Sequence, residues 1–392
     1  MYLETTGGSD KTVDNSASFI IGADYFTFVS TTKDYSIRVR FLTWRDDDVP
    51  VRRTTAIAVV MAPALALLLV AGGGTSVAPV LPAPEFTVTK YAGNPIISVA
   101  DDPSEAVEQY VPAPFRVPNG DIWVYVKGQR DIYAWQSTDG GETFTLVNGG
   151  VPVIENEVGQ WDSQFALEPS GFIEDDIIHL YYKGTNDSGA QDDWSWGHAT
   201  APVSDPTDVT KDAGNPIATP ADVIADIGGT SIEDLAISDV VKLGSTYHYY
   251  GYVLLDNRYQ LIQATGTDVD NPDGFESILL AQSDLHVVTS PSVFKLTGSA
   301  YIMFYTQGTF SVSNDSSRVK AAVSQDAVNW TFDLATIIEG TPSTWDEDRA
   351  YAAAVLKQGS SPEPFLVDGD LVLYYSGQNS GVADTGLAYL TP

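Results

Sequence analysis

The chain has 392 residues, with 52 acidic and 20 basic side chains, 11% aromatic residues and no cysteine. The lack of cysteine excludes a disulfide scaffold, a thiolate metal site and a cysteine nucleophile. A formal charge of −32 repels phosphate backbones and anionic lipids, which argues against nucleic acids and membrane surfaces as partners. The hydrophobic content of 43% indicates a folded acidic protein and not a disordered chain.

Residues 1–50 show little periodicity, and we expect no element of a packed core there. From Val51 two arginines precede an apolar run from Ala56 to Ala71, and small residues follow. These are the parts of a secretory signal, which belongs at the extreme N-terminus. We therefore hypothesise that translation starts at Val51, that residues 1–50 are a start-site artefact, and that residues 51–80 direct secretion. A membrane anchor is the alternative, although the run is shorter than the ~20 residues that a span needs.

The acidity belongs to the remaining part of the chain. Residues 81–392 contain 13 bases and 44 acids, a net charge of −31 spread over short Asp-rich turns. Such turns suit a solvated surface, and a structural Ca²⁺ ion is the alternative. We expect no required cofactor and a monomer. His179 and His248 occupy matching strand positions, which favours a structural role for them over metal binding.

An aromatic strand that ends near a glycine recurs five times, and the closing glycines lie 56, 67, 57 and 69 residues apart, at 121–128, 177–184, 246–251, 301–308 and 371–377. Each copy is preceded by a second expected strand, at 113–117, 168–173, 236–241, 290–294 and 363–367. Each is followed by a third, at 133–137, 197–200, 262–265, 320–324 and 386–389. Short turns such as Asn119-Gly120 join the first two strands, as in hairpins.

Five antiparallel units of about 60 residues, without helical periodicity, predict an all-β fold, a five-bladed β-propeller of four-stranded blades over residues 85–392. The fifth unit stops soon after its third strand. The segment Glu85–Lys90 has no unit of its own, so we expect it to supply the missing outer strand and close the ring. A β-sandwich or another blade count is the alternative.

Several motifs resemble those of a known group. They are the Asn-Pro-Ile junctions at 94–96 and 215–217, Trp161-Asp162 ahead of Glu168-Pro169, the Tyr-Tyr-Lys-Gly strand at 181–184 and the stretch 199–206. They resemble the five-bladed propeller glycoside hydrolases, that is, the arabinanase/xylosidase and invertase/levansucrase group with related mannoside phosphorylases. The resemblance implies a site around the axis where the innermost strands begin, with three carboxylates from successive blades.

Glycosidic cleavage needs one protonated carboxyl group and one ionised carboxylate, and acids crowded around one axis separate each other's pKa values. The candidate catalytic residues are Asp162, Glu168, Glu233, Asp234 and Glu363. Blade 1 departs from the group's pattern because Ala113-Pro114 stands where the base is expected. Asp102 lies about ten residues too early for that strand, and Glu105 and Glu108 are weaker substitutes. A solvated loop position is the alternative for each candidate.

Aromatic and basic residues supply candidates for sugar binding. Sugar faces pack on aromatic rings, and basic side chains bind hydroxyl or carboxylate groups. The candidates are Trp161, Trp345, Arg116, Arg130 and Arg349, with packing or a structural ion pair as the alternative. We expect packing between blades for Trp194 and Trp196.

The sequence predicts a secreted glycosidase that cleaves or transfers glycosidic bonds of a plant or microbial polysaccharide or oligosaccharide. Two alternatives remain open. The turn at 137–144 and the segment 115–118 resemble the Asp box and the Phe-Arg-Ile-Pro motif of sialidases, although those have six blades. The vacant position in blade 1 favours instead a non-catalytic propeller that binds a glycan or a protein.

Overall fold

The computed structural model describes residues 15–21, 24–30, 38–41, 84–98, 100, 109–186, 194–281, 286–296, 300–309 and 316–392. The chain divides into two compact units, Met1–Pro79 and Val80–Pro392. The expected signal segment, residues 51–80, lies almost wholly in the first unit and outside the described residues. Within the described part of the chain, no helix has the length and apolar character needed to cross a membrane.

The first unit contains an antiparallel sheet with the order β1-β2-β3, formed by β1 (Asn15–Ile21), β2 (Asp24–Ser30) and β3 (Arg38–Phe41). The expectation for this region is that no element of a packed core occurs there. Three strands occur, and the expectation about a packed core stays a prediction. These strands are rich in Phe, Ile, Val and Thr, which favour extended backbone even where a clean period of two is lacking.

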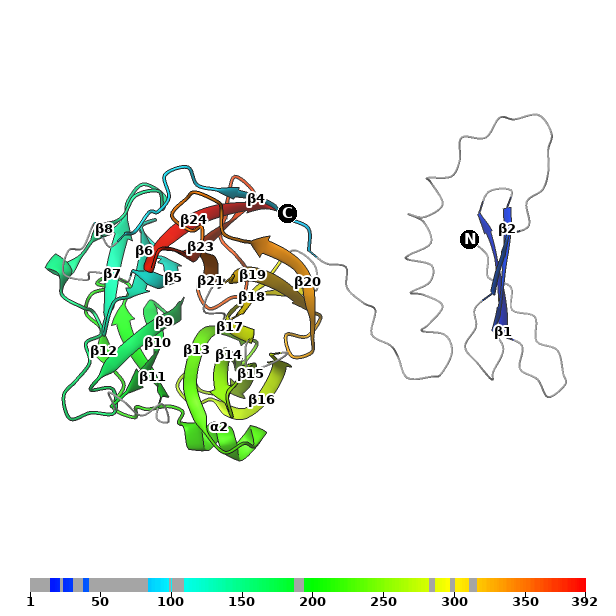
Figure 1. Ribbon diagram of the computed structural model, residues 1–392. Coiled ribbons are helices and arrows are strands. Elements are labelled where there is room, and N and C mark those ends of the chain that lie inside the picture. The colour runs from blue at the N-terminus through cyan, green and yellow to red at the C-terminus, as the bar shows by residue number, and fades with distance from the viewer. Residues whose placement is uncertain are drawn as a thin grey trace. The chain divides into compact units, whose positions relative to one another are not determined.

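The second unit consists of five antiparallel sheets arranged as a ring (Figure 1). Blade 1 contains β5 (Tyr110–Arg116), β6 (Ile122–Lys127), β7 (Ile132–Ser137) and β8 (Thr145–Leu146). Blade 2 contains β9 (Phe165–Glu174), β10 (Ile177–Thr185), β11 (Ser195–Pro202) and β12 (Thr210–Lys211). Blade 3 contains β13 (Ile232–Leu243), β14 (Thr246–Leu255), β15 (Arg258–Gly266) and β16 (Asp273–Leu280).

Blade 4 contains β17 (His286–Lys295), β18 (Tyr301–Thr309), β19 (Arg318–Ser324) and β20 (Trp330–Ile338). Blade 5 contains β21 (Arg349–Val355), β23 (Asp370–Asn379), β24 (Val382–Thr391) and β4 (Thr87–Lys90), with β22 (Leu366–Val367) paired to β23. Two short helices complete the unit, η1 (Asn148–Gly150) after β8 and α2 (Pro220–Ile227) between blades 2 and 3. The predicted five-bladed propeller is confirmed.

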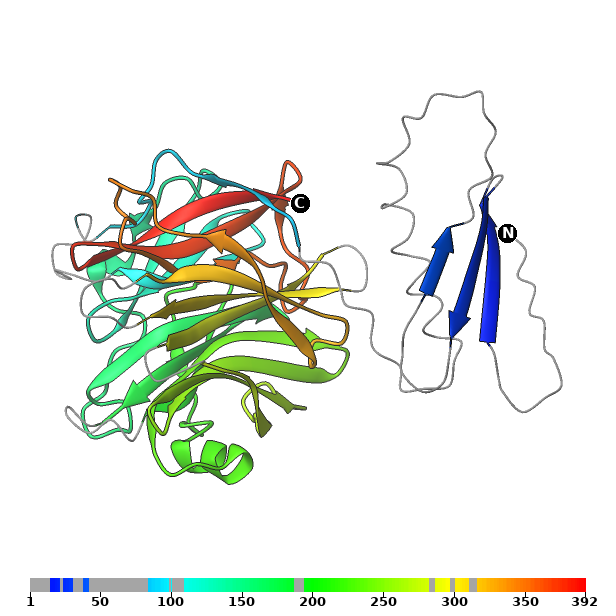
Figure 2. The ribbon, with the colours of Figure 1, turned by 45° about the vertical axis from the view of Figure 1, so that its right-hand side comes forward.

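The ring closes through β4, which pairs with β24 from Ala388↔Lys90 to Thr391↔Thr87. The two strands run side by side although they come from opposite ends of the unit (Figures 1 and 2). The predicted closing strand is therefore confirmed. Without β4, the outer edge of β24 in blade 5 would be unpaired.

The hydrophobic core lies between neighbouring blades. Its five clusters each join two adjacent sheets, and one of them joins blade 5 to blade 1. Large aromatic side chains such as Trp135, Trp196 and Tyr250 are fully buried there. Burying one such side chain contributes roughly 1.5–3 kcal/mol, so each interface between blades stabilises the ring.

The inner strand of blade 5 differs from the prediction. The sequence analysis placed it at 363–367, whereas β21 (Arg349–Val355) pairs with β23 and β22 forms only a short hairpin with the same strand. The segment between them contains Pro362 and Pro364, which have no backbone N–H to donate to a continuous ladder. Proline therefore marked an interruption of the inner strand here and not its beginning.

Blades 2 and 5 each contain the same cluster, in which a Trp-Asp pair contacts glycines, a lysine and a tyrosine; we call it the Trp-Asp lock. In blade 2 the Trp161 ring packs against Gly184 of the second strand and Gly197 of the third. In blade 5 the Trp345 ring packs in the same way against Gly377 and Gly386. A side chain on any of these glycines would clash with the ring. Asp162 accepts hydrogen bonds from Lys211 at 2.6 Å and Tyr182 at 3.1 Å. In blade 5 the corresponding carboxylate of Asp346 accepts from Lys90 at 2.6 Å and Tyr375 at 3.0 Å.

The lock explains the duplicated connectors at 90–96 and 211–217, because each begins with the lysine that reaches the aspartate. It also bears on three predictions. Asp162 is buried and paired inside its blade, which argues against the predicted catalytic role. Trp161 and Trp345 are half-buried and pack on glycines and tyrosines of their own blades, which favours the packing alternative for both.

We expect Asp346→Ala to lower the free energy of unfolding by about 2–4 kcal/mol at pH 7, because Lys90 then loses its carboxylate partner and Tyr375 loses its acceptor. Burial acts to raise the pKa of Asp346, but hydrogen bonds from Lys90 and Thr344 outweigh it and the pKa is lowered. This contribution is present above the ordinary Asp pKa of about 3.9 and is lost as the pH falls through the lowered pKa. Urea denaturation at pH 7 and pH 3 measures the difference.

The matched control is Glu363→Ala, which removes an exposed carboxylate from the same blade. It should change the free energy of unfolding little at either pH. Equal losses in the two variants would contradict the assignment of Asp346 to the lock.

Candidate active site

Two carboxylates, Glu168 and Asp234, meet where the inner strands β9 and β13 begin. Glu168 lies in a β-bulge: its φ is 54°, and the pairing of β9 with β10 changes register around it. A bulge changes the direction of the side chain it carries. Here it brings the Glu168 carboxylate against Lys183 of β10 and Tyr252 of β14.

The same bulge recurs in other blades, at Val111 with φ of 55°, Ser290 with φ of 52° and Ala352 with φ of 47°. Val111-Pro112 is therefore the blade 1 equivalent of Glu168-Pro169. The prediction had matched Ala113-Pro114 with Glu168-Pro169, which is two residues too far along the chain. The mistake arose because Pro112 and Pro114 offer two equal registers. No residue of β5 is acidic, so the vacancy predicted in blade 1 holds for this strand. Asp102, Glu105 and Glu108 lie outside the described residues.

Lys183 joins the two carboxylates. Its Nζ lies 2.7 Å from Glu168 Oε1 and 2.9 Å from Asp234 Oδ1. These two oxygens are thus no further apart than the sum of those distances, about 5.6 Å. The Tyr252 hydroxyl oxygen lies 2.7 Å from Glu168 Oε2 and 3.3 Å from Asp234 Oδ2. The side chains of Lys183, Glu168 and Asp234 are 6%, 14% and 19% exposed, so the charges interact in a largely dry environment.

The two carboxyl groups have different affinities for protons. Burial acts to raise the pKa of Glu168, but the ammonium groups of Lys183 and Lys127 outweigh it and the pKa is lowered. Burial also acts on Asp234, where Lys183 opposes it and the negative charge of Glu168 adds to it, so the pKa is raised. The pair thus favours an ionised Glu168 beside an Asp234 that binds a proton more readily.

Aromatic and basic side chains surround this pair. The Lys183 ammonium lies 4.6 Å from the ring centroid of Trp194, which stacks on Phe165 at 5.9 Å. The guanidinium of Arg130 lies 5.6 Å from the Phe165 ring. The ring centroids of Tyr110 in blade 1 and Tyr351 in blade 5 lie 5.8 Å apart. Such rings offer apolar faces on which a sugar ring packs.

Four of the predicted residues lie at this end of the inner strands. Glu168 and Asp234 are in direct contact with the same lysine, and Arg130 lies at the edge of the cluster. Arg349 begins β21, as Phe165 begins β9. Glu233 directly precedes Asp234 in β13, where the pairing with β14 changes register. It forms no ion pair or hydrogen bond with Lys183 or Tyr252, both of which the structure describes, and its catalytic role stays a prediction.

Two predicted residues lie at the other end. Arg116 ends β5, and its guanidinium lies 4.7 Å from the ring of Phe365. Glu363 is exposed and stands two residues before Phe365, after β21 has ended. Both predictions are therefore corrected. Arg116 and Glu363 lie at the opposite end of the inner strands from Glu168. The prediction for Glu363 followed from taking 363–367 as the inner strand of blade 5, and that for Arg116 from the scarcity of basic residues.

Lys183, Tyr252 and Lys127 were missed as functional candidates. Lys127 and Lys183 end the first two repeated strands in the same Lys-Gly dipeptide, which was used only to mark the repeat. Because bases are scarce in this acidic chain, two lysines at matching positions were a usable signal. Tyr252 carried no such signal, since the second strand of each blade contains tyrosine.

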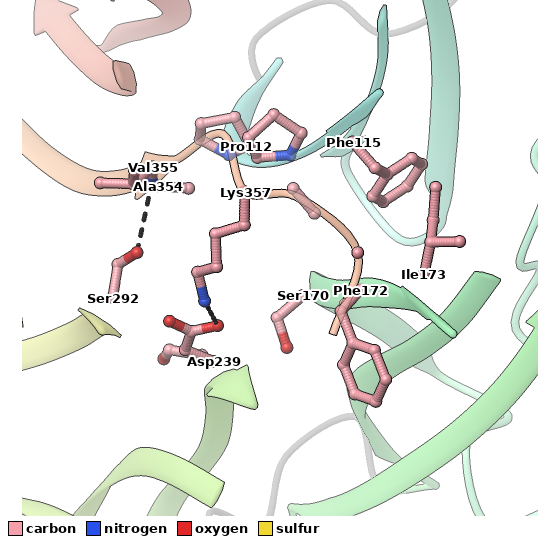
Figure 3. A pocket seen from close by; sticks show the side chains of 15 residues that line it. Pro112, Phe115, Ser170, Phe172, Ile173, Asp239, Ser292, Ala354, Val355 and Lys357 are labelled. Atoms are coloured by element: carbon pink, nitrogen blue, oxygen red, sulfur yellow. Dashed lines mark hydrogen bonds and ion pairs between the residues drawn. The ribbon is translucent and has the colours of Figure 1, made fainter. Parts of the chain in front are cut away.

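A pocket opens between the inner strands beyond the bulges (Figure 3). Lys357 extends into it from the segment after β21 and pairs with Asp239, while Ser170 and Ser292 lie nearby. Burial raises the pKa of Asp239 and lowers that of Lys357, while the charge of each partner opposes the effect of burial on the other. We place the candidate site at Glu168 and Asp234 because glycosidic cleavage needs two carboxyl groups and this pocket offers one.

The turns that resemble Asp boxes have a structural role. Asp139 accepts hydrogen bonds from the Thr143 hydroxyl, from Ser137 and from two backbone N–H groups, and the Thr143 bond is the main reason that its pKa is lowered to about 2. Asp326 makes the same kind of turn with Ser324 in blade 4. Together with the five blades, this removes the support for the six-bladed sialidase alternative.

Comparison with known proteins bears on the fold. No protein-family model matches the chain, and no curated protein sequence matches it significantly. Among solved structures, the α-L-arabinofuranosidase of Podospora anserina in complex with cellotriose is 12% identical, with a TM-score of 0.57 over 80% of this chain and 98% of that one. The chain has the fold of five-bladed β-propeller glycoside hydrolases.

Two further structures support this assignment. The endo-arabinase of Bacteroides thetaiotaomicron is 13% identical, with a TM-score of 0.53 over 78% of this chain and 97% of that one. A family 62 glycoside hydrolase in complex with xylotriose is 14% identical, with a TM-score of 0.53 over 79% and 98%. The resemblance drawn from the sequence motifs is confirmed for the fold of this propeller.

We expect Lys183→Met to lower the free energy of unfolding by about 3–5 kcal/mol at pH 7, because two buried carboxylates then lack their shared cation. Without the cation, one carboxyl pKa rises above its unfolded value. A raised pKa costs stability as the pH increases through it, so the loss should be smaller at pH 4.5 than at pH 7. Urea denaturation at both pH values measures it.

The double variant Lys183→Met/Asp234→Asn is the control, since it removes one of the two repelling charges. Its loss of stability should depend much less on pH. A single variant with the same loss at both pH values would show that Lys183 does not separate the two charges.

Proposed function

We propose that this protein is a glycosidase in which Asp234 is the proton donor and Glu168 is the ionised carboxylate beside it. The observation that carries the proposal is the pair itself, held by one lysine and one tyrosine, with the pKa of Glu168 lowered and that of Asp234 raised. The Tyr252 hydroxyl has one hydrogen to donate, and the shorter contact indicates that it donates this hydrogen to Glu168. A proton on Asp234 Oδ2 then donates to the tyrosine oxygen and satisfies the longer contact.

In the proposed reaction the Asp234 proton passes to the leaving glycosidic oxygen as its bond to the anomeric carbon breaks. The negative charge of Glu168 stabilises the positive charge that develops on the sugar ring, and water adds to the anomeric carbon while its proton passes to a base. No residue of β5 is suited to that role. Asp102, the candidate from the sequence, stays a prediction.

The substrate class follows by analogy from the solved structures with this fold. Their titles name arabinofuranosidase and arabinase activities and complexes with cellotriose and xylotriose. We propose arabinose-containing plant polysaccharides as the substrates, with the aromatic rings of Tyr110 and Tyr351 as sugar platforms. Secretion, as expected from residues 51–80, would give the enzyme access to such polymers.

Glycan binding without catalysis is the second candidate function. The absence of an acidic residue from β5 favours it, because a bound sugar then meets a donor without a partner base on that strand. Both candidates use the same site, and they differ only in whether the glycosidic bond breaks.

Hydrolysis of arabinan, arabinoxylan, aryl arabinofuranosides, xylan, fructan and mannan tests the proposal. We expect release of arabinose, and losses of about 10²–10⁴ in kcat for Asp234→Asn and Glu168→Gln. Glu363→Gln is the control and should retain the wild-type rate, since it removes an exposed acid at the other end of the blade. Binding of these polymers without hydrolysis would favour the second candidate.

The pH profile gives a separate prediction. The rate should fall with increasing pH as Asp234, whose pKa is raised, loses its proton, and it should fall in acid as Glu168, whose pKa is lowered, gains one. Asp234→Asn should abolish the alkaline limb of the residual kcat. Retention of that limb in the variant would assign the donor to another group.

A further inference from the structure

A second cluster of ionisable groups lies away from the candidate active site, between blades 2 and 3. His198 comes from β11, Asp212 from the connector after β12, and Asp270 from the loop between β15 and β16. One ligand atom from each lies within 4.8 Å of the others. The fold also brings His179 of β10 into contact with His198 of β11.

His198 is set as a metal ligand would be. Its side chain is only 3% exposed and packs between the rings of His179 and Tyr181. Its Nε2 lies 3.1 Å from His179 Nδ1, while its Nδ1 faces Asp212 Oδ2 at 3.4 Å, which is long for a hydrogen bond. When the Nε2–H group donates to His179, the Nδ1 lone pair points toward the two carboxylates. A metal-bound histidine usually donates its other ring N–H to a hydrogen-bond acceptor, which fixes the orientation of the ring.

The two carboxylates lack an obvious counter-charge. Asp212 and Asp270 are close enough for their carboxyl groups to act as hydrogen-bond partners, which two ionised carboxylates cannot be. Among the residues that the structure describes, neither forms an ion pair with Lys or Arg. A proton or a cation between them is needed to remove the repulsion.

The loop that carries Asp270 is positioned independently of the cluster. The Tyr181 hydroxyl donates to the carbonyl of Val269 at 2.7 Å, and that of Tyr249 to the carbonyl of Asp268 at 2.6 Å. On the other side, Asp212 Oδ1 accepts from the Gly214 N–H at 2.8 Å. Both carboxylates are therefore held in place before a cation arrives, which reduces the cost of ordering them on binding.

We propose that His198, Asp212 and Asp270 bind a divalent transition metal of the zinc class, which links the blade 2 connector to the outer loop of blade 3. One imidazole nitrogen with two carboxylates suits Zn²⁺ better than Ca²⁺ or Mg²⁺, which prefer oxygen ligands alone. The ion would connect two adjacent blades of a ring that has no disulfide. This inference does not depend on the proposed glycosidase function.

Isothermal titration of the untagged, chelator-treated full chain with ZnCl₂ tests the inference, with CaCl₂ and MgCl₂ titrated in parallel. We expect one Zn²⁺ per chain, and a rise in Tm of a few degrees when Zn²⁺ is in large excess over its Kd. Asp270→Asn should weaken Zn²⁺ binding at least tenfold and lose the rise in Tm. Asp268→Asn, in the same loop but outside the cluster, should retain both.

Three results would overturn the inference. They are no binding of Zn²⁺ by the wild-type chain, equal binding by wild type and Asp270→Asn, and binding of Ca²⁺ or Mg²⁺ in preference to Zn²⁺. A Tm that is unaffected by Zn²⁺ but rises on acidification would assign the contact between the carboxylates to a shared proton. Because the measurements are binding and melting, failure of glycosidase activity has no effect on them.

Discussion

The pairing of β4 with β24 is the constraint on which the rest of the ring depends. It joins the two ends of the second unit, supplies the outer strand that blade 5 lacks, and carries Lys90 to the buried carboxylate of Asp346. Val88 of β4 and the neighbouring Phe86 also pack against the core cluster between blades 4 and 5. In a chain without cysteine, backbone hydrogen bonds and burial of apolar surface do the work that disulfides do in many small secreted domains.

A closed ring has a functional consequence, because it fixes the inner strands relative to one another. Glu168 and Lys183 come from blade 2 and meet Asp234 and Tyr252 from blade 3. Two carboxylates and one ammonium group in a largely dry space cannot all be satisfied equally. The result is one carboxyl group whose pKa is lowered and one whose pKa is raised, and a difference of this kind is what acid catalysis at a glycosidic bond needs.

The repeated architecture and the chemistry are separable. Four inner strands carry a bulge with positive φ, but its residue is Val111, Glu168, Ser290 or Ala352, so only one of the four bulges presents an acid. The Trp-Asp lock is likewise repeated in blades 2 and 5, and it serves assembly in both. Repetition therefore marks what builds the ring, and departure from repetition marks where a blade has acquired chemistry of its own.

The sequence by itself determined the five units, their second and third strands, the closing strand at 85–90 and two of the acids that meet in the cluster, Glu168 and Asp234. These follow from local patterns, namely alternation, turn residues and the spacing of glycines. Only the tertiary structure decided the register of β5, the split inner strand of blade 5, the bridging role of Lys183 and the burial of Asp162. Each of these depends on contacts between residues far apart in the chain, and the periodicity of a strand is the same whichever partner it meets.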